Sequence, residues 1–483
     1  MTLETSKDTE TVIAIDLDGT LTNTDTLHES VINLLRDHPA SILALPFWLI
    51  QGKAAFKSDL ADHVDLDVTL LPYNTQLIDW LKDERSAGKK IVLCTAADRR
   101  VAQAIADHLG LFDAVIASDG VTNNSGVNKR AVLEQNFGAR GYDYAGNSAA
   151  DVAVWAGARQ AIVVNATDAV AKRAAEVAAV SKIFAPPTIT LSHWRRLFRV
   201  HQWLKNLLLF VPLLAAHQIT DIQSLSTLIL AFISFSLCAS AVYMANDLLD
   251  LESDRKHPRK RHRPFAAAAI PIKAGAVLVP LFAATSFALG LMVGMAFTAW
   301  LSLYFLLTCA YSLWLKRLVL IDCLTLAALY TVRIIAGGTA TYLFPSFWLL
   351  ALSIFIFTSL AFVKRYSELQ LQSSLGIEHA HGRGYVVSDA PLLHAFGVTA
   401  GYSAVLVLAL YIHSGTGVGL YRLPELLWPA VPLFLLWISW IWLSAHRGKM
   451  HDDPLVFAIK DKMTWSIFLL IGMFFLAAAL LGR

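Results

Sequence analysis

Three aspartates lie close together in the segment NDLLDLESD, which spans residues 246–254 at the end of a long apolar stretch. Asp247, Asp250 and Asp254 are separated by three and four residues, so a helix would carry them on one face. Carboxylate oxygens in such a group suit Mg²⁺, which proteins usually bind through one or two carboxylates together with substrate phosphates. The spacing therefore predicts a magnesium site for a diphosphate at a membrane surface.

A second acidic group follows a short apolar run near the N-terminus. In TVIAIDLDGTLTNTD, residues 12–15 are predicted to form a buried strand, and Asp16 and Asp18 follow it directly. Ligands of open α/β sheets bind outside the carboxyl ends of the strands. Because carboxylates can act as nucleophile and as general acid or base, we expect Asp16 and Asp18 to be catalytic.

The composition indicates a membrane protein with a polar N-terminal part. Of 483 residues, 56% are hydrophobic and 16% are charged. Residues 1–188 have mixed polarity and are predicted to form one cytosolic domain, because the polar start MTLETSKDTE lacks the character of a signal peptide. Residues 189–483 are predicted to form an all-α membrane domain. The four cysteines show no CxxC spacing, which argues against a disulfide framework or zinc site, and nothing supports nucleic-acid binding.

Nine apolar segments in the second domain approach the length of about 20 residues that a bilayer core requires. Lys and Arg are concentrated in the loops after the second, fourth, sixth and eighth segments, so the positive-inside rule predicts that these loops and the N-terminal domain are cytoplasmic. The predicted spans are residues 204–218, 223–246, 270–292, 295–314, 318–341, 347–363, 392–413, 425–444 and 463–482.

The DLDGT sequence resembles the first motif of the haloacid dehalogenase (HAD) superfamily of phosphatases. The resemblance implies a Rossmann-like α/β domain with a helical cap at about residues 25–88. It also implies an attack by Asp16 on phosphorus and proton transfer by Asp18. Thr95 and Lys129 match the residues of the family that bind phosphate, although a solvated surface lysine is the other interpretation of Lys129. Mg²⁺ would be held by Asp16, Asp18 and Asp151.

Two features of the N-terminal domain leave alternatives open. Asn147 stands where the fourth HAD motif usually has an acidic residue, so the domain could instead be a regulatory or tethering module without catalysis. The apolar stretch SILALPFWLI, residues 41–50, is too short to cross a bilayer. We expect it to form the core of the cap, with an interfacial membrane anchor as the alternative.

The second domain resembles the UbiA superfamily of intramembrane prenyltransferases over roughly residues 192–483. HQWLKNLLLFVPLL, NDLLDLESDRKHPRKRHRPFAA, YSLWLKRLVLIDCLTLAALYTVRIIAGG and FVKRYSELQ resemble the branch that contains decaprenyl-phosphate phosphoribosyltransferase. This resemblance implies nine transmembrane helices, with Asp247 and Asp250 as catalytic residues and Asp254 as a further Mg²⁺ ligand. The residues expected to contact the substrates are Lys205, Asn246, Arg263, Lys316, Arg333, Lys364, Arg365 and Glu368.

Asp322 and Arg333 lie at the edge of the fifth predicted span or inside it. Ionisable residues there cost roughly 2.5–3.5 kcal/mol on insertion scales and usually face a cavity or a partner. We expect Asp322 to join the metal site. Arg333 is expected to meet the lipid phosphate or to balance another buried charge.

The loop after the sixth span lacks the second aspartate motif that is typical of UbiA prenyltransferases. It contains Lys364 and Arg365 instead, and Arg can bind phosphate through two parallel hydrogen bonds. Such cations suit substrates with several phosphates, although ordinary basic loops that obey membrane topology would look the same.

Together these features predict a bifunctional enzyme of the bacterial inner membrane. Its membrane domain would transfer 5-phosphoribose from phosphoribosyl diphosphate to a polyprenyl phosphate, and its HAD domain would then remove the 5-phosphate, as a step in cell-envelope biosynthesis. The alternatives are a conventional aromatic prenyltransferase that uses a prenyl diphosphate, and a HAD domain without catalysis. An oligomer is compatible with the sequence.

Overall fold

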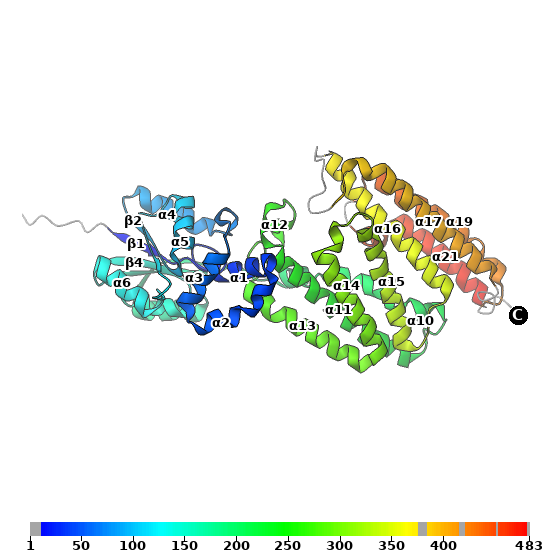
Figure 1. Cartoon of the computed structure of the whole chain (residues 1–483), viewed down its shortest axis with the longest axis horizontal. Coiled ribbons are helices and arrows are strands. Elements are labelled where there is room, and N and C mark those ends of the chain that lie inside the picture. The colour runs from blue at the N-terminus through cyan, green and yellow to red at the C-terminus, as the bar shows by residue number, and fades with distance from the viewer. Residues whose placement is uncertain (1–10, 375–383, 415–420, 451–452, 481–483) are drawn as a thin grey trace, which may run out of the picture. The chain divides into compact units, whose positions relative to one another are not determined.

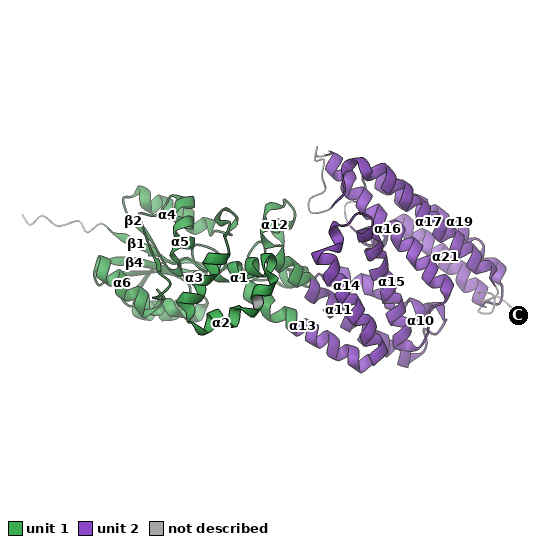
Figure 2. Ribbon diagram, in the orientation of Figure 1, with its two compact units in different colours: residues 1–198, 243–280 green, residues 199–242, 281–483 purple. Residues whose placement is uncertain are grey.

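The computed structural model describes residues 11–374, 384–414, 421–450 and 453–480. It contains two compact units (Figure 2). Unit 1 comprises residues 1–198 and 243–280, and unit 2 comprises residues 199–242 and 281–483. These units are defined by packing, and residues 243–280 pack with the N-terminal domain. The boundary between residues 188 and 189 that the sequence predicts therefore stays a prediction.

A six-stranded parallel sheet forms the centre of unit 1 (Figure 1). Its strand order is β3-β2-β1-β4-β5-β6, so the order reverses between β1 and β4, where doubly wound sheets bind ligands. The bounds of the strands are Val12–Ile15, Lys90–Asp98, Ala114–Ser118, Tyr142–Gly146, Gln160–Val164 and Ala179–Phe184 for β1 to β6. This arrangement confirms the predicted α/β fold of the N-terminal domain.

Side chains of β1 alternate between the two faces of the sheet. Ile13 and Ile15 pack in the core that includes helices α4 (Thr75–Ser86) and α5 (Arg99–Leu109). Val12 and Ala14 pack in the opposite core. That second core includes residues of α6 (Val127–Phe137), α7 (Val152–Trp155) and α8 (Asp168–Val177). Burial on both faces explains why the strand has four consecutive apolar residues.

The insertion between β1 and β2 is helical. It contains α1 (Thr26–Asp37), η1 (Pro39–Leu43), α2 (Leu45–Ile50), α3 (Lys53–His63) and η2 (Val68–Leu70), followed by α4. The prediction that SILALPFWLI forms the core of the cap is wrong, because α2 has no buried residue. Leu43, Phe47, Leu49 and Ile50 are between 55% and 84% exposed. Helix α2 is only six residues long, so its apolar side chains are too few to form a core.

The alternative, an interfacial anchor, stays a prediction, and it suits this exposed apolar surface. We expect a fluorophore attached to Phe47→Cys, in the full-length protein reconstituted in vesicles, to be quenched by lipids brominated in their acyl chains. Val121→Cys is the matched control, since Val121 is 89% exposed on the same unit. Equal quenching at both positions would reject the anchor, and disulfide crosslinking between two copies at position 47 would point to self-association instead.

The second segment of unit 1 contains the predicted magnesium motif. It begins within α11 (Ile222–Leu249) and continues through α12 (Leu251–Lys256) and η5 (Lys260–His262) into α13 (Ile272–Val293). Asp250 lies between α11 and α12, where its φ of −92° and ψ of 11° interrupt the helix. The three aspartates therefore lie on two helices and the residue between them, whereas their spacing predicted one continuous helical face.

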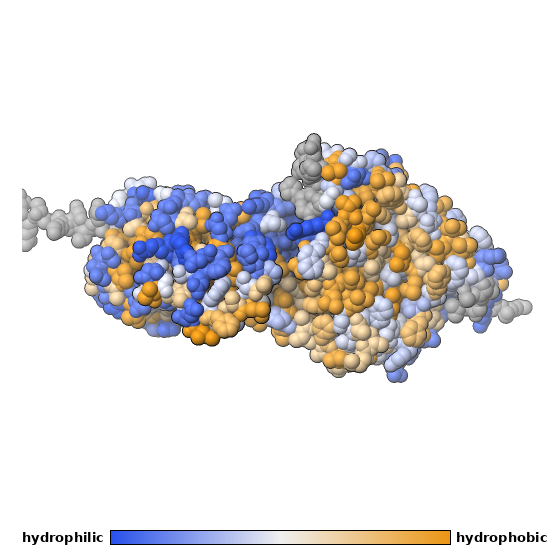
Figure 3. Space-filling view, viewed as in Figure 1, coloured by the Kyte–Doolittle hydropathy of each residue, from blue (hydrophilic) through white to orange (hydrophobic). Residues whose placement is uncertain are grey.

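Helices are the main secondary structure of the described residues of unit 2, and apolar side chains cover much of its visible face (Figure 3). Its helices are η4 (Val200–Phe210), α10 (Val211–Ala215), α14 (Met295–Leu313), η6 (Leu315–Arg317), α15 (Ile321–Thr341), α16 (Phe347–Ser374), η7 (Val387–Asp389), α17 (Ala390–His413), η8 (Pro424–Leu427), α19 (Ala430–His446), α20 (Pro454–Lys460) and α21 (Lys462–Leu480), with most of α11 and α13.

Eight helices in the described part of the chain are long and apolar enough to cross a membrane. The first predicted span, 204–218, is not among them, because Val200–Phe210 is a 3-10 helix and only Val211–Ala215 is α-helical. This segment packs closely on α15. A Cβ atom added at Gly337 would lie 2.0 Å from the backbone oxygen of Leu209. Eight of the nine predicted spans are therefore helices long and apolar enough to cross a membrane, while the crossing of the shorter apolar segment 204–218 stays a prediction.

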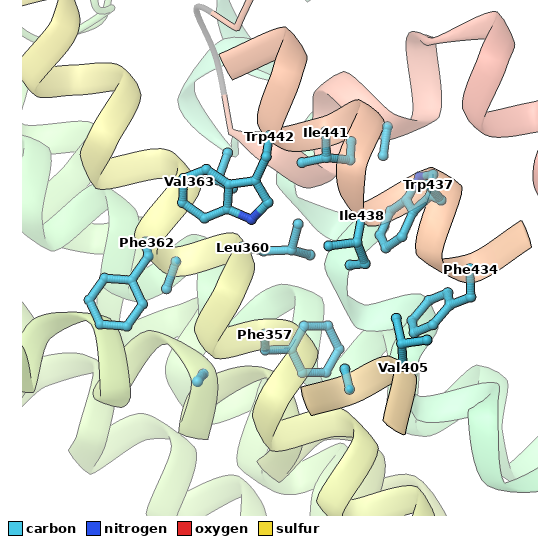
Figure 4. Packing of buried hydrophobic residues seen from close by; sticks show 14 of the residues in the cluster. Phe357, Leu360, Phe362, Val363, Val405, Phe434, Trp437, Ile438, Ile441 and Trp442 are labelled. Carbon is cyan, nitrogen blue, oxygen red and sulfur yellow. The ribbon is translucent and has the colours of Figure 1, made fainter. Parts of the chain in front are cut away.

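The core of unit 2 joins α16, α17 and α19 (Figure 4). Phe357, Leu360, Trp437 and Trp442 are among its buried side chains. A Cβ atom added at Gly397 of α17 would lie 2.1 Å from the Trp442 ring, so the glycine allows the tryptophan to approach the helix. Small residues let helices pack closely in this way inside membranes, where water does not drive their association.

Candidate functional sites

Asp16 and Asp18 follow β1 at the reversal point of the sheet. The tight turn after them depends on Gly19, whose φ is +75° and whose added Cβ would lie 1.9 Å from Asn147 Nδ2. Burial raises the pKa of Asp16 to about 6, although Lys129 opposes the shift. Burial, with Asp25 adding to it, raises the pKa of Asp18 to about 7.

Lys129 begins a chain of buried hydrogen bonds at the edge of this site. Its Nζ donates to Asp16 Oδ1 at 2.7 Å and to the Tyr144 hydroxyl at 2.8 Å, and that hydroxyl donates to Asp151 Oδ1 at 2.8 Å. Asp151 Oδ2 accepts from the backbone and side chain of Ser148 and from the backbone of Asn147. Lys129 is buried rather than a solvated surface lysine, and the metal-binding role of Asp151 stays a prediction.

Two buried threonines lie near this site, Thr20 in the DLDGT motif and Thr95 on the neighbouring strand β2. Thr20 Oγ1 has no hydrogen-bond partner within the described residues. Thr95 lies in β2, and its Oγ1 accepts a hydrogen bond from the backbone N–H of Ala97 at 3.0 Å. A buried hydroxyl without a partner is costly unless a ligand or water satisfies it, so Thr20 indicates a place for a polar group.

Lys57 is a basic residue of this site that the sequence analysis missed. It lies on α3 of the insertion, and its Nζ donates to the backbone oxygen of Ala96 at 2.6 Å. Burial lowers its pKa, while the charges of Asp18 and Asp25 oppose that shift. A single lysine in a helical segment carries no local signal of this position, because the contact joins residues that are 39 positions apart.

Asn147 lies against the DLDGT turn, so its identity bears on metal binding. We expect Asn147→Asp to add a carboxylate to the site and to lower the Mg²⁺ concentration for half-maximal hydrolysis of p-nitrophenyl phosphate. A tenfold decrease would correspond to about 1.4 kcal/mol of binding free energy. Asn136→Asp, the same change on an exposed part of α6, is the control. An unchanged Mg²⁺ dependence would show that position 147 does not contact the ion.

The aspartate motif of α11 and α12 surrounds an arginine. Arg263 Nη1 donates to Asp247 Oδ1 at 3.0 Å and to Asp254 Oδ2 at 2.6 Å, while Asn246 Nδ2 donates to Asp250 Oδ2 at 2.8 Å. Burial raises the pKa of Asp254, and Arg263 opposes that rise. The motif therefore brings Asp247, Asp254 and Arg263 together, with Asn246 and Asp250 as a second pair.

The donor set around this motif fits an ion that is shared with a phosphate substrate. Asp254 Oδ1 is buried and has no hydrogen-bond partner in the described parts of the chain, and the guanidinium of Arg263 already places one positive charge between two carboxylates. Within residues 11–374 and the later described ranges, no three His, Cys, Asp or Glu side chains form a group that could hold a metal alone. Mg²⁺ bound here would need further oxygen ligands from a substrate or water.

Asp322 at the start of α15 is paired with Arg365 of α16. Arg365 Nη2 lies 2.7 Å from Asp322 Oδ2, and both side chains are fully buried. Arg365 also pairs with Glu368, and the Tyr385 hydroxyl donates to Asp322 Oδ1 at 2.5 Å. The roles of Asp322 as a metal ligand and of Arg365 and Glu368 as substrate contacts stay predictions. Tyr385 was missed, because it lies 63 positions away from Asp322.

Lys205 and Lys364 converge on Asp453, an acidic residue that the sequence analysis missed. Lys205 Nζ lies 2.6 Å from Asp453 Oδ2, and Lys364 Nζ lies 3.7 Å from the same oxygen. Burial would raise the pKa of Asp453, but the two lysines outweigh it and lower the pKa to about 2. Among the described residues, the cluster therefore holds two lysines around one carboxylate.

Arg333 lies in the middle of α15 and joins three elements of unit 2. Its guanidinium donates to Asn206 Oδ1 at 2.9 Å, to the Leu329 backbone oxygen and to the Tyr304 hydroxyl at 3.0 Å. These partners are neutral, so they satisfy its hydrogen bonds without cancelling its charge. Lys316, the remaining predicted contact, lies in the short η6 helix between α14 and α15.

Unit 2 also contains an apolar cavity of about 1160 Å³. Its walls include Val211, Leu214, Leu352 and Phe475, together with residues of the connection between α15 and α16. Of the predicted site residues that the structure describes, none lines it. Its surface suits an apolar chain rather than a diphosphate.

Residues 207–468 match the model of the UbiA prenyltransferase family. The chain belongs to the UbiA prenyltransferase family. Residues 13–156 match the haloacid dehalogenase-like hydrolase model, so this family member carries a HAD-like domain ahead of its UbiA domain. The family and the eight apolar helices together make it an integral membrane protein.

Relatives of this UbiA family member cover different parts of the chain. The protein named Uncharacterized protein y4nM of Sinorhizobium fredii is 36% identical over 96% of this chain and 90% of its own length. Nodulation protein NoeC of Azorhizobium caulinodans is 36% identical over 54% of this chain and 85% of its own. Decaprenyl-phosphate phosphoribosyltransferase of Mycobacterium tuberculosis is 34% identical over 40% of this chain and 65% of its own.

Proposed function

We propose that this protein transfers 5-phosphoribose from phosphoribosyl diphosphate to a polyprenyl phosphate and then removes the 5-phosphate. The similarity to decaprenyl-phosphate phosphoribosyltransferase supports the first step, and the HAD-like domain supports the second. The observation that carries the choice of substrate is the absence of a second aspartate motif from the sequence after the sixth predicted span, where Lys364 stands instead. The product would be a lipid-linked pentose for synthesis of the cell envelope.

In the first step, an oxygen of the lipid phosphate attacks C1 of the ribose while the bond between C1 and the diphosphate oxygen breaks. Asp247, Asp250 and Asp254 supply the carboxylates of the diphosphate site. Mg²⁺ bound there would stabilise the negative charge that develops on the departing diphosphate. The two lysines that meet at Asp453, Lys205 and Lys364, suit a phosphate group of either substrate. The protein's part in this step is to hold the two substrates in line.

In the second step, Asp16 attacks the 5-phosphate and displaces the ribose oxygen, which Asp18 protonates. Asp18 then accepts a proton from the water that hydrolyses the aspartyl-phosphate, so that orthophosphate leaves and both carboxyls are restored. Lys129, at 2.7 Å from Asp16, offsets negative charge where the phosphate would bind. Thr26 holds Asp18 through two hydrogen bonds, from its backbone N–H at 2.7 Å and its hydroxyl at 2.8 Å.

The first step is tested by supplying purified full-length protein with labelled phosphoribosyl diphosphate and a polyprenyl phosphate. In parallel, labelled prenyl diphosphate is supplied with an aromatic acceptor. We expect label in the lipid only from the phosphoribosyl donor. Alkylation of the aromatic acceptor, without transfer of phosphoribose, would establish the conventional prenyltransferase instead.

We also propose that both sites face the cytoplasm, since the basic loops suit the inner side of a plasma membrane. Introduced cysteines test this orientation. In intact cells, a membrane-impermeant thiol reagent should label Tyr342→Cys, between α15 and α16, and spare Lys449→Cys, after α19; both positions are exposed. Labelling at position 449 but not at 342 would show that the orientation is inverted.

A further inference from the structure

Helix α1 of the HAD-like domain packs against α12, the helix that carries Asp254 of the aspartate motif. Arg255 of α12 donates two hydrogen bonds to Glu29 of α1, at 2.6 and 3.1 Å. Further along α1, Asn33 Nδ2 and Arg36 Nη1 donate to the Glu252 carboxylate at 2.7 and 2.6 Å. Residues 29, 33 and 36 share one face of α1, and residues 252 and 255 share one face of α12. The two faces are therefore complementary along their length.

The order of charges determines the register of this contact. Along α1 the acidic Glu29 precedes the basic Arg36, and they meet the basic Arg255 and the acidic Glu252. A shift that exchanged the partners would oppose like charges. Glu29 is 1% exposed and Arg255 is 7% exposed, so neither charge is solvated well enough to lose its partner without a large penalty.

Arg255 connects this contact to the aspartate motif itself. It follows Asp254 in the chain, and its Nε donates to the Ala266 backbone oxygen at 3.1 Å. Three residues before Ala266 lies Arg263, which bridges Asp247 and Asp254. Arg255 thus connects α1 to α12, which carries Asp254, and to the segment that contains Arg263. One turn before Glu29, α1 begins at Thr26, which holds Asp18.

We propose that α1 is a structural part of the transferase site. Glu29, Asn33 and Arg36 are positioning residues, which hold α12 and the segment of Arg263 where transfer requires them. Phosphoribosyl transfer therefore depends on the docked HAD-like domain, even though that domain's chemistry follows in the next step. That the reaction is the transfer of phosphoribose rests on the proposed function, whereas the contact between α1 and α12 does not.

A charge exchange in the full-length protein tests this role. Arg36→Glu and Glu252→Arg each place like charges in contact, and the double variant restores opposite charges at a pair that is only partly buried. We expect each single variant to lower the kcat of transfer by about 10- to 100-fold, because small displacements of catalytic groups cost rates of this size. The KM for the lipid should stay unchanged, and the double variant should recover most of the rate.

Two further measurements separate positioning from unfolding. Hydrolysis of p-nitrophenyl phosphate should be normal in all three variants, which shows that the HAD-like domain is folded. Amide hydrogen exchange of residues 250–266 should be faster in the single variants and return to the wild-type rate in the double variant. Glu29→Gln, which removes the buried charge opposite Arg255, should give the same local increase in exchange.

The outcomes distinguish this inference from the proposed function. Wild-type transfer in both single variants would overturn the positioning role, whether or not exchange changes. Loss of transfer without recovery in the double variant would also overturn it. If the wild type used prenyl diphosphate instead of phosphoribosyl diphosphate, the proposed function would fail, and the same variants assayed in that reaction would decide the role of α1.

Discussion

Asp250→Asn should abolish transfer of phosphoribose while leaving the protein folded. The side chain keeps its shape and can still accept the hydrogen bond that Asn246 donates at 2.8 Å, but it loses its negative charge. A metal-bound diphosphate leaving group depends on that charge. A loss of several kcal/mol of transition-state stabilisation corresponds to about 10³-fold or more in kcat. Steady-state transfer with labelled phosphoribosyl diphosphate measures the loss.

The control is Asp221→Asn, which makes the same change just before the other end of α11. Asp221 accepts hydrogen bonds from the backbone N–H groups of Gln223 and Ser224 through its two oxygens, and asparagine can still accept one of them as a helix cap. This variant should transfer at the wild-type rate. If Asp250→Asn retained near-normal transfer, the aspartate motif would have no part in the mechanism.

Asp16→Asn should uncouple the two steps and make the 5-phosphorylated lipid accumulate. The variant lacks the nucleophile that the second step requires, while the aspartate motif, which performs the first step, is unchanged. In the wild type, a domain tethered to the transferase experiences its product at an effective concentration that can reach about millimolar. Wild-type protein should therefore release mainly the dephosphorylated lipid. Mass spectrometry of the extracted lipids distinguishes the two products.

Asp168→Asn, an exposed change on α8 of the same domain, should leave the products as in the wild type. If the wild type and Asp16→Asn both yielded only the phosphorylated lipid, the HAD-like domain would not perform the second step. A tethering or structural role would then be the better description of that domain.

The features that sequence predicted best are those encoded by local patterns. The four apolar residues before Asp16 predicted β1, because only a strand buried on both faces needs such a run. Eight long apolar segments predicted eight helices, because a helix needs about 20 apolar residues to cross a bilayer core. The segment 204–218 was harder, because it forms a 3-10 helix followed by a short α-helix in place of the single long helix that its hydrophobicity predicted.

The features that sequence could not predict are contacts between distant residues. Lys205 and Asp453 are 248 positions apart, and Arg255 and Glu29 are 226 positions apart. Each residue alone resembles an ordinary charged residue of a loop or helix surface. Only the fold shows that Asp453 pairs with two lysines, or that α1 of the insertion contacts α12 of the aspartate motif. The break of the helix at Asp250 was also hidden, because the spacing of the aspartates suits one continuous helix equally well.

The central claim, two successive reactions by one chain, is tested most directly with doubly labelled phosphoribosyl diphosphate. The donor carries ¹⁴C in the ribose and ³²P in the 5-phosphate, and full-length protein is reconstituted with a polyprenyl phosphate. We predict that ¹⁴C accumulates in the lipid, while ³²P enters the lipid transiently and then appears as orthophosphate. A lipid that keeps ¹⁴C and ³²P in a constant ratio, or one that gains neither label, would contradict the claim.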